Sequence, residues 1–168
     1  MKKPLIGFVG QGWIGKNYAN DFEKRGYKTV RYALEEPYRN NKEKIKGPRI
    51  VFIAVPTPTT PNGFDVSIVQ QVIKLVGVGK IAVIKSTILP GTAKTLQKKY
   101  PARIILHSPE FLSELTAAEE AANPFSNIIG MAGNSNRHKI AAEKVMAVLP
   151  KSPFNLICTS EEAELFKY

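Results

Sequence analysis

Seven short runs of apolar residues, most of them rich in valine and isoleucine, recur along the chain between longer amphipathic stretches. Continuous apolar runs of this length are typical of β-strands that are covered on both faces, as in parallel sheets. The pattern therefore predicts buried strands at Leu5–Val9, Thr29–Tyr32, Ile50–Val55, Ile81–Lys85, Arg103–Leu106, Asn127–Met131 and Asn155–Cys158.

The stretches between these runs carry helical patterns with recognisable ends. Gly26 and Pro150 end two of them, and Asp65 and Ser135 stand at N-cap positions. Because strands and helices alternate, we expect an α/β fold with a Rossmann-type, doubly wound and mostly parallel sheet. The predicted helices span Trp13–Arg25, Val66–Val76, Thr92–Lys99, Glu114–Ala122 and Asn136–Leu149.

Two further segments lie outside this alternation. Ala33–Pro48 is polar and charged, which predicts a surface loop with a weak helical turn. Near the end of the chain, Thr159-Ser160-Glu161-Glu162 has the form of a capping box and predicts a helix that continues through Ala163–Tyr168. There is no internal repeat or linker, and the length of 168 residues predicts one domain, residues 1–168.

Composition and charge exclude several classes of protein. The hydrophobic share of 43% and the charged share of 23% are typical of a globular protein rather than a disordered or fibrous one. No apolar run approaches the roughly 20 residues needed to cross a bilayer, so no membrane partner is expected. The net charge of +10 favours phosphate-bearing ligands. Since the lysines and arginines are scattered without interleaved aromatic residues, specific nucleic-acid binding is not expected.

The cysteine and histidine content bounds the chemistry further. Cys158 is the only cysteine, which excludes an intramolecular disulfide and favours a reducing, cytoplasmic location. We interpret it as a small apolar core residue. His107 and His138 match no metal-ligand pattern, so no metal is expected. His107 is predicted to lie at a strand end beside the site, and His138 on the exposed face of a helix.

A glycine-rich motif follows the first predicted strand and opens the first helix. Gly10-Gln11-Gly12-Trp13-Ile14-Gly15 fits the pattern GxGxxG. We expect Gly10 to permit the tight turn, Gly12 to let a pyrophosphate approach the backbone, and Gly15 to let the helix pack on the strand. The helix N-terminus would then offer free N–H groups to the phosphates. The alternative is a glycine-rich turn used only for packing.

The residue that would hold the adenosine ribose is less clear. A carboxylate usually stands at the end of the second strand, about 20 residues after the glycine loop. This chain has Arg31 and Tyr32 there, and the first acidic residues after them are Glu35 and Glu36. Arg31 could face the 2′-phosphate of NADP or could be a solvated strand end, so NAD and NADP both remain open.

Three more motifs follow later strands: Val55-Pro56-Thr57-Pro58, Lys85-Ser86-Thr87-Ile88-Leu89-Pro90-Gly91-Thr92 and Ser108-Pro109-Glu110-Phe111-Leu112-Ser113-Glu114. Like the glycine loop, each stands at the carboxyl end of a strand, where open α/β sheets bind ligands. In this order, and over nearly the whole chain, the four motifs resemble the N-terminal NAD-binding domain of the UDP-glucose/GDP-mannose 6-dehydrogenase family. The resemblance implies NAD as cofactor and a nucleotide sugar as substrate.

The resemblance also implies roles for single residues. Thr87 would order a water near the reacting carbon, and Glu110 would act as base or water activator in a hydrolytic step. The nucleotide sugar would contact Phe111, Leu112, Ser113 and Glu114. The cofactor would contact Gly10, Gln11, Gly12, Trp13, Ile14, Gly15, Tyr32, Val55, Pro56, Thr57, Ser86, Thr87 and Glu114.

Each of these motifs also has a purely structural interpretation. Pro56 and Pro58 could stiffen a loop, and Ser86 and Thr87 could cap the following helix. The predicted helix from Glu114 would place Glu110 and Glu114, four residues apart, on one face if it extended back to Glu110. Acidic residues at a helix start are also favoured by the helix dipole alone.

The chain departs from the family pattern at several positions. Leu115 stands where the family usually has glycine, Glu120 where it has aspartate, and Ser126 where it has arginine. These differences affect the expected substrate contacts more than the fold.

The resemblance implies an oxidation of the C6 alcohol of the sugar to a carboxylate by two hydride transfers to NAD, through a thiohemiacetal and a thioester on a cysteine. In the family that cysteine, with a partner lysine and asparagine, lies downstream of the segment that matches Ala163–Tyr168. We therefore expect the central and C-terminal substrate domains to be absent from this chain, which would be catalytically incomplete alone. A non-catalytic dinucleotide-binding module or partner subunit is the alternative. Full-length relatives are expected to be homodimers, and Leu165 and Phe166 to expose an apolar face.

Overall fold

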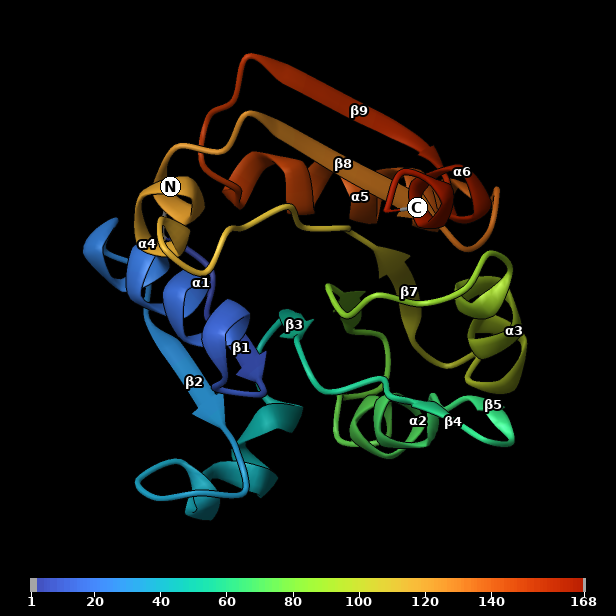
Figure 1. Ribbon diagram of the computed structural model, residues 1–168, viewed down its shortest axis with the longest axis horizontal. Helices are drawn as coiled ribbons and strands as arrows, with labels where there is room; N and C mark the ends of the chain where they lie inside the picture. The colour runs from blue at the N-terminus through green and yellow to red at the C-terminus, as the bar shows by residue number, and fades with distance from the viewer. Residues whose placement is uncertain (1–2, 168) are drawn as a thin grey trace.

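The computed structural model describes residues 3–167. Its centre is a seven-stranded sheet with the strand order β2-β1-β3-β6-β7-β8-β9 (Figure 1). The strands are β1 (Ile6–Val9), β2 (Thr29–Tyr32), β3 (Ile50–Ile53), β6 (Ile81–Ile84), β7 (Ile104–His107), β8 (Ser126–Met131) and β9 (Phe154–Thr159). All seven predicted strands are therefore confirmed, with ends that differ by at most two residues.

The direction of the strands follows the predicted Rossmann pattern over most of the sheet. The first five strands of the order are parallel, and Phe8 of β1 lies between Arg31 of β2 and Phe52 of β3. β8 is antiparallel to β7, and β9 is parallel to β8. The last two strands thus run opposite to the first five. The expectation of a mostly parallel sheet is confirmed.

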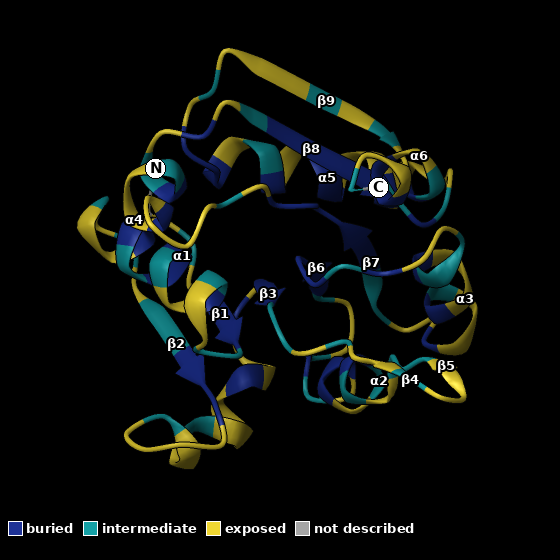
Figure 2. Ribbon diagram, in the orientation of Figure 1, coloured by how far each residue is buried: buried dark blue, intermediate teal, exposed yellow. Residues whose placement is uncertain are grey.

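Helices cover both faces of the sheet. They are α1 (Trp13–Lys24), α2 (Ser67–Ile73), α3 (Thr92–Lys99), α4 (Ala117–Ala122), α5 (Asn136–Val148) and α6 (Ser160–Leu165), with a 3₁₀ segment η1 (Arg39–Lys46) in the predicted surface loop. One core cluster joins α1 and α5 to one face of the sheet, and a second joins η1, α2 and α3 to the other. Figure 2 shows the buried central strands between these two layers.

One small element was not predicted from the sequence. β4 (Thr59–Thr60) and β5 (Gly63–Phe64) form an antiparallel hairpin after β3. Pro61 and Asn62 form the turn between its strands, and Gly63, the first residue of β5, has a φ of +106°, which glycine adopts readily. The hairpin projects beside α2 in Figure 1.

The last described helix is held tightly against the sheet. The predicted capping box is confirmed, because Thr159 and Glu162 exchange side-chain and backbone hydrogen bonds at the start of α6. A Cβ atom on Gly130 would lie 2.5 Å from the Cβ of Ala163, so only glycine in β8 permits this approach of α6. The buried Glu164 carboxylate accepts the backbone N–H of Gly91 at 2.5 Å and of Ala93 at 2.8 Å, and thereby caps α3. Tyr168 lies outside the described residues.

Replacing Glu164 with glutamine should change how stability depends on pH. Burial raises the pKa of Glu164 above its ordinary value of 4.5, although its two backbone N–H donors lower it. A carboxyl group with a raised folded-state pKa contributes stability that is complete below the unfolded-state pKa and is lost as pH rises through the folded-state pKa. Chemical denaturation across mildly acidic pH should therefore show wild-type stability falling, relative to Glu164→Gln, as pH rises. A relative stability that rises with pH would contradict this assignment.

Two sequence interpretations of single side chains are wrong. His138 is buried rather than exposed, because its Nδ1 lies 2.8 Å from Ser135 Oγ and its Nε2 lies 2.9 Å from Gln97 Oε1. Cys158 is only half-buried, because β9 is an edge strand whose outer positions are open to solvent. Burial raises the pKa of the Cys158 thiol to about 11.

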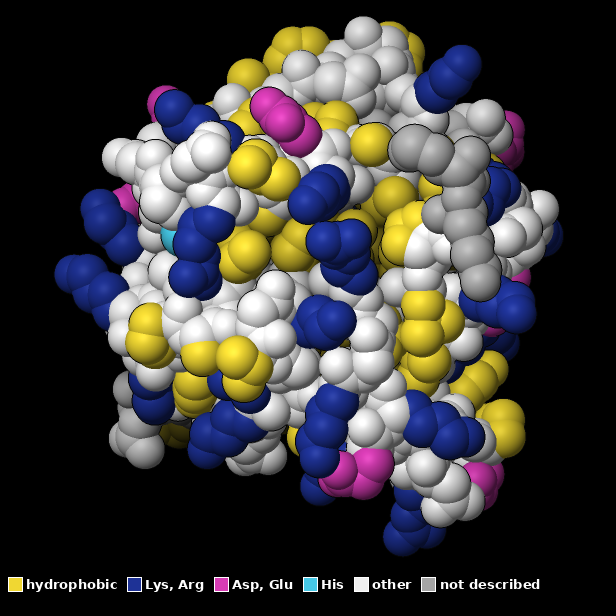
Figure 3. All heavy atoms as spheres, turned by 180° about the vertical axis from the view of Figure 1, so that it is seen from behind, with side chains coloured by type: hydrophobic (Ala, Val, Ile, Leu, Met, Phe, Trp, Pro, Cys, Tyr) yellow, Lys and Arg dark blue, Asp and Glu magenta, His cyan; other side chains and the backbone are white. Residues whose placement is uncertain are grey.

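No helix within residues 3–167 is long and apolar enough to span a membrane. Figure 3 shows lysine and arginine side chains distributed over the rear face, with few acidic side chains among them. Leu165 and Phe166, which were predicted to expose an apolar face, are 59% and 50% exposed.

Candidate dinucleotide and substrate site

The three glycines of the loop between β1 and α1 differ in what surrounds them. Gly10 has a φ of +89°, and a Cβ on it would lie 2.0 Å from the carbonyl oxygen of Ala54. A Cβ on Gly15 would lie 2.0 Å from the carbonyl oxygen of Gly10. Gly12, in contrast, has no atom within 4 Å of its ideal Cβ position. Gly10 and Gly15 are therefore required by packing, whereas Gly12 faces open space.

The N-terminus of α1 is free to bind an anion. Gly12 is its N-cap residue, no side chain caps it within the described part of the chain, and its first turn holds no acidic residue. The helix has 12 residues, and its backbone dipole leaves partial positive charge at this end. The open space at Gly12 lies directly in front of these N–H groups, which is the geometry that binds phosphate in dinucleotide-binding domains.

A cavity of about 650 Å³ opens at this loop and is called the glycine-loop cavity below. It lies at the carboxyl ends of the parallel strands β1, β2, β3 and β6. The predicted cofactor residues that line it are Gly10, Gln11, Gly12, Trp13, Ile14, Tyr32, Val55, Pro56, Ser86 and Thr87. Gly15, Thr57 and Glu114 do not line it, so the structure brings together most but not all of the predicted set.

The residues around Ser86 join two of the predicted motifs. The Ser86 hydroxyl donates to the carbonyl oxygen of Val55 at 2.7 Å and accepts its N–H at 3.0 Å. The Thr57 hydroxyl donates to the carbonyl oxygen of Thr87 at 2.8 Å. These bonds fix the loop after β3 against the loop after β6, and Thr87 stays half-buried at the wall of the cavity.

The position of Arg31 at the end of β2 differs from both interpretations of this residue that the sequence allowed. Its side chain is buried and pairs with Glu23 at 2.6 Å and with Asn20 at 2.9 Å. Arg31 is thus neither a solvated strand end nor a lining residue of the glycine-loop cavity. Glu35 and Lys42 line that cavity instead, and Glu35 stands three residues after Tyr32.

Glu110 and Glu114 do not share a helix face, which corrects the sequence prediction. α4 begins only at Ala117, and the segment before it is irregular because the Glu120 carboxylate accepts the N–H of Ser113 at 2.6 Å. Glu114 is exposed in a turn, whereas Glu110 is 6% exposed. Only Glu110 is therefore held in a defined position by the folded chain.

The Glu110 carboxylate is bound from two sides. Its Oε2 accepts the backbone N–H of Leu112 at 2.8 Å, and its Oε1 lies 3.3 Å from Lys167 Nζ. Lys167 also donates to the carbonyl oxygen of Glu110 at 2.6 Å. No sequence motif pointed to Lys167, because its approach depends on the packing of α6 over Gly130.

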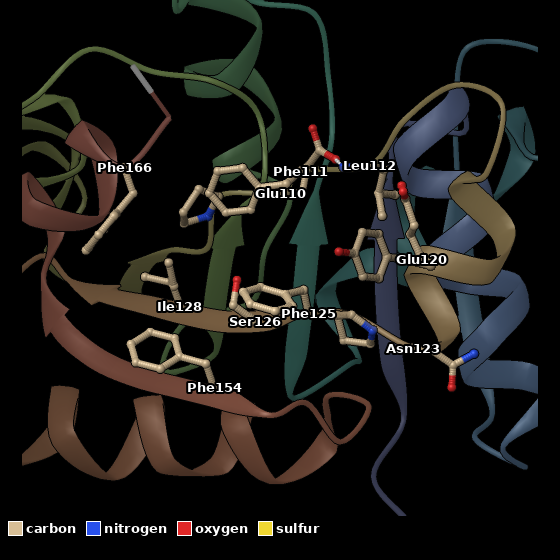
Figure 4. A pocket seen from close by; sticks show the side chains of 13 residues that line it. Glu110, Phe111, Leu112, Glu120, Asn123, Phe125, Ser126, Ile128, Phe154 and Phe166 are labelled. Carbon is tan, nitrogen blue, oxygen red and sulfur yellow. Dashed lines mark hydrogen bonds between the residues drawn. The ribbon is translucent and has the colours of Figure 1, made fainter.

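A second cavity, of about 530 Å³, adjoins Glu110 and is called the phenylalanine cavity. Phe111, Phe125, Phe154 and Phe166 line it, and in Figure 4 Phe154 and Phe166 lie on the left whereas Leu112 and Glu120 lie on the right. Of the predicted substrate residues, Phe111 and Leu112 line it and Ser113 and Glu114 do not. Ser126, which stands where the family usually has arginine, also lines it.

Two buried basic residues, Lys85 and His107, lie at the carboxyl ends of the neighbouring strands β6 and β7. Lys85 is 4% exposed, and burial lowers its pKa to about 8. His107 is fully buried at the end of β7, as its predicted strand-end position required, and burial lowers its pKa to about 3. The imidazole is therefore neutral at pH 7. Within residues 3–167, no cluster of histidine, cysteine and carboxylate side chains has the form of a metal site.

The parallel strands, the glycine turn, the uncapped helix and the cavity at the strand ends together define a dinucleotide-binding domain of the Rossmann type. Residues 34–148 match the family described as the UDP-glucose/GDP-mannose dehydrogenase family, NAD binding domain. The chain belongs to this family. The resemblance inferred from the four motifs and the expectation of NAD as cofactor are thereby confirmed.

Solved structures share this fold over almost the whole chain. UDP-glucose dehydrogenase from Pyrobaculum islandicum is 24% identical with a TM-score of 0.85, over 99% of this chain and 49% of that one. GDP-mannose dehydrogenase from Pseudomonas aeruginosa is 20% identical with a TM-score of 0.79, over 97% and 48%. The chain thus spans about half the length of these enzymes. 3-Hydroxyisobutyrate dehydrogenase from Mycobacterium tuberculosis, 13% identical, matches with a TM-score of 0.74 over 99% of this chain and 58% of that one, so the fold alone does not define a substrate.

Proposed function

We propose that this chain binds NAD in the glycine-loop cavity and forms the cofactor domain of a nucleotide-sugar 6-dehydrogenase, which oxidises the C6 alcohol of the sugar to a carboxylate. The observation that carries the proposal is the open space at Gly12 in front of the uncapped N-terminus of α1. Glycine is needed at Gly10 and Gly15 for packing, but nothing in the folded chain itself requires it at Gly12. A ligand that approaches the backbone supplies that requirement.

The residues of the cavity fit this cofactor. The N–H groups at the start of α1 would hold the pyrophosphate, and the strand-end loops fixed by Ser86 and Thr57 would lie along the dinucleotide. When bound, NAD accepts the hydride in each oxidation step. Thr87, which lines the cavity, is proposed to order a water near the reacting carbon.

Glu110 is proposed as the base that activates water in the hydrolytic step. Its burial, the N–H of Leu112 and the ammonium group of Lys167 support this role, because together they fix the direction of the carboxylate. A base must lie within hydrogen-bond reach of its water, which requires such fixed geometry. Phe111 and Leu112, at the phenylalanine cavity next to Glu110, are proposed to contact the nucleotide sugar. For the exposed Glu114 and Ser113, contact with substrate or cofactor stays a prediction.

The complete oxidation needs a nucleophile that residues 3–167 do not place near Glu110. Cys158 lies on the edge strand β9 with a pKa raised to about 11, so its thiolate is scarce at pH 7. We propose that substrate domains corresponding to the other half of the solved enzymes provide the nucleophile. We also propose that the protein is cytoplasmic and that its full-length relatives form homodimers.

Calorimetric titration of the chain with NAD and, separately, with NADP tests the cofactor assignment. We expect saturable binding of NAD with one site per chain. NADP should bind more weakly, because Glu35 lines the cavity and its carboxylate would repel a 2′-phosphate, whereas Arg31 is already paired with Glu23. Absence of binding would overturn the proposal, and tighter binding of NADP would overturn the roles of Glu35 and Arg31.

Glu35→Gln should weaken NAD binding by about 10-fold, equivalent to roughly 1.4 kcal/mol. The loss is expected because a carboxylate accepts hydrogen bonds from a ribose diol more strongly than an amide does. Glu36→Gln is the matched control, since the neighbouring Glu36 does not line the cavity. Equal effects of the two substitutions on calorimetric affinity would show that only general surface charge is involved.

A further inference from the structure

Lys85 is a buried cation that the roles proposed above do not use. Its backbone N–H continues the sheet by donating to the carbonyl oxygen of Ile53 at 2.8 Å, so its position is fixed by the ladder of β6 and β3. Its ammonium group lies 4.3 Å from the centre of the Tyr18 ring on α1. Lys85 thereby connects two residues that line different cavities: it is adjacent in the chain to Ser86, which lines the glycine-loop cavity, and its ammonium group contacts Tyr18, which lines the phenylalanine cavity.

The ammonium group of Lys85 binds the chain just before Glu110. Its Nζ donates to both the carbonyl oxygen and the hydroxyl of Ser108, each at 3.2 Å. The backbone N–H of Ser108 donates to the carbonyl oxygen of Ile84 at 2.8 Å. Ser108 is thus tied to the end of β6 through its N–H, its carbonyl oxygen and its side chain.

This attachment is transmitted to Glu110 over a short and stiff path. Only Pro109 separates Ser108 from Glu110, and its ring fixes φ near −65°. On the other side, Lys85 is separated from Thr87 only by Ser86, whose hydroxyl is bonded to Val55. Besides the backbone bond from Ser108 to Ile84, the Lys85 side chain therefore links the segment that holds Thr87 to the segment that holds Glu110.

We propose that Lys85 is a positioning residue, whose buried ammonium group holds the Glu110 carboxylate in a fixed place relative to Thr87. The importance of that placement for chemistry rests on the function proposed above, but the placement itself can be tested without catalysis. The N–H of Leu112 is a direct reporter, because it donates to Glu110 Oε2 at 2.8 Å.

The charges around Lys85 set the pH range in which its ammonium group is charged and holds Ser108. Burial is the main cause that lowers the Lys85 pKa to about 8; Lys167 lowers it further, and Glu110 raises it. The other titratable groups that face this region are Tyr18 on α1, whose pKa burial raises, and His107 on β7, whose pKa burial lowers to about 3. Neither Tyr18 nor His107 changes charge near pH 8, so their titration is separate from that of Lys85.

The test compares the wild-type chain with Lys85→Met by backbone-amide NMR. Methionine keeps an unbranched side chain of similar length but has no donor. We expect hydrogen exchange at Leu112 to be at least about 10-fold faster in Lys85→Met, with Gly10, whose N–H bonds to Tyr32, unchanged. In the wild-type chain, the Leu112 amide shift should show a step with a midpoint near pH 8, and this step should be missing from Lys85→Met. Lys98→Met, on the exposed side of α3, is the control.

Two results would overturn the proposal: unchanged Leu112 exchange in folded Lys85→Met, or a step near pH 8 that survives in that variant. If Lys85→Met does not fold, the wild-type titration still tests the proposal. A Leu112 amide shift without a step near pH 8 would then contradict the positioning of Glu110 by Lys85. NAD binding is measured on the same samples and should not change. If the wild-type chain does not bind NAD, only the proposed function is refuted, because the Leu112 measurements do not depend on NAD binding.

Discussion

Gly12→Val will lower the affinity of the chain for NAD by at least about 100-fold, equivalent to roughly 2.7 kcal/mol, without unfolding it. The space in front of Gly12 is empty, and its backbone is extended, with φ −68° and ψ −165°, so valine fits the free protein. The same side chain would stand in front of the N-terminal N–H groups of α1. A pyrophosphate could then not reach these groups, which provide its main binding contacts.

Calorimetric titration with NAD measures this loss, and thermal unfolding of the same sample shows that the fold is kept. Gly47→Val is a useful control, because Gly47 follows η1 and lies outside the set that lines the glycine-loop cavity. Full NAD affinity in a folded Gly12→Val variant would contradict the position assigned to the pyrophosphate. Loss of folding in this variant would contradict the open space at Gly12.

Gly10→Ala should destabilise the chain by about 3 kcal/mol or more, the range expected for severe backbone and packing conflicts. A Cβ on Gly10 would lie 2.0 Å from the carbonyl oxygen of Ala54, and the φ of +89° is unfavourable for alanine. The contact with Ala54 cannot relax unless the glycine loop moves away from the end of β3.

Chemical denaturation measures the difference, and Gly79→Ala separates its two causes. Gly79 also has a positive φ, of +73°, but no atom lies within 4 Å of its ideal Cβ position. It should therefore lose only the backbone contribution, about 1 to 2 kcal/mol. Equal losses at the two positions would show that the contact with Ala54 has no energetic consequence.

The fold could be predicted from local patterns because they agree with one another. The buried strands β1, β3 and β6 are covered on both faces, so every position in them is apolar or glycine and their sequence alone defines them. The reversed direction of β8 could not be predicted, since a buried strand reads the same in either direction. The β4–β5 hairpin was missed because each of its strands has only two residues.

More of the predicted cofactor residues than of the predicted substrate residues line their cavity, and this difference has a physical reason. The glycine loop and the motifs of Val55 and Ser86 act through backbone geometry at strand ends, which sequence spacing defines. The place of Glu110 depends instead on Lys167, Lys85 and the irregular segment before α4, and these contacts join residues far apart in the chain. The environment of Arg31 was not predicted for a different reason: Glu23 is only eight residues away, but the pairing depends on how α1 packs beside β2.

Fluorescence energy transfer from Trp13 to NADH tests the central claim most directly. Trp13 is the only tryptophan of the chain, is 53% exposed and lines the glycine-loop cavity next to Gly12. If NAD binds in this cavity, titration with NADH should quench Trp13 emission and sensitise NADH emission to saturation, and excess NAD should reverse both changes. Saturable NADH binding by calorimetry without energy transfer would place the cofactor elsewhere, and no binding at all would contradict the assignment of this chain as a working NAD-binding domain.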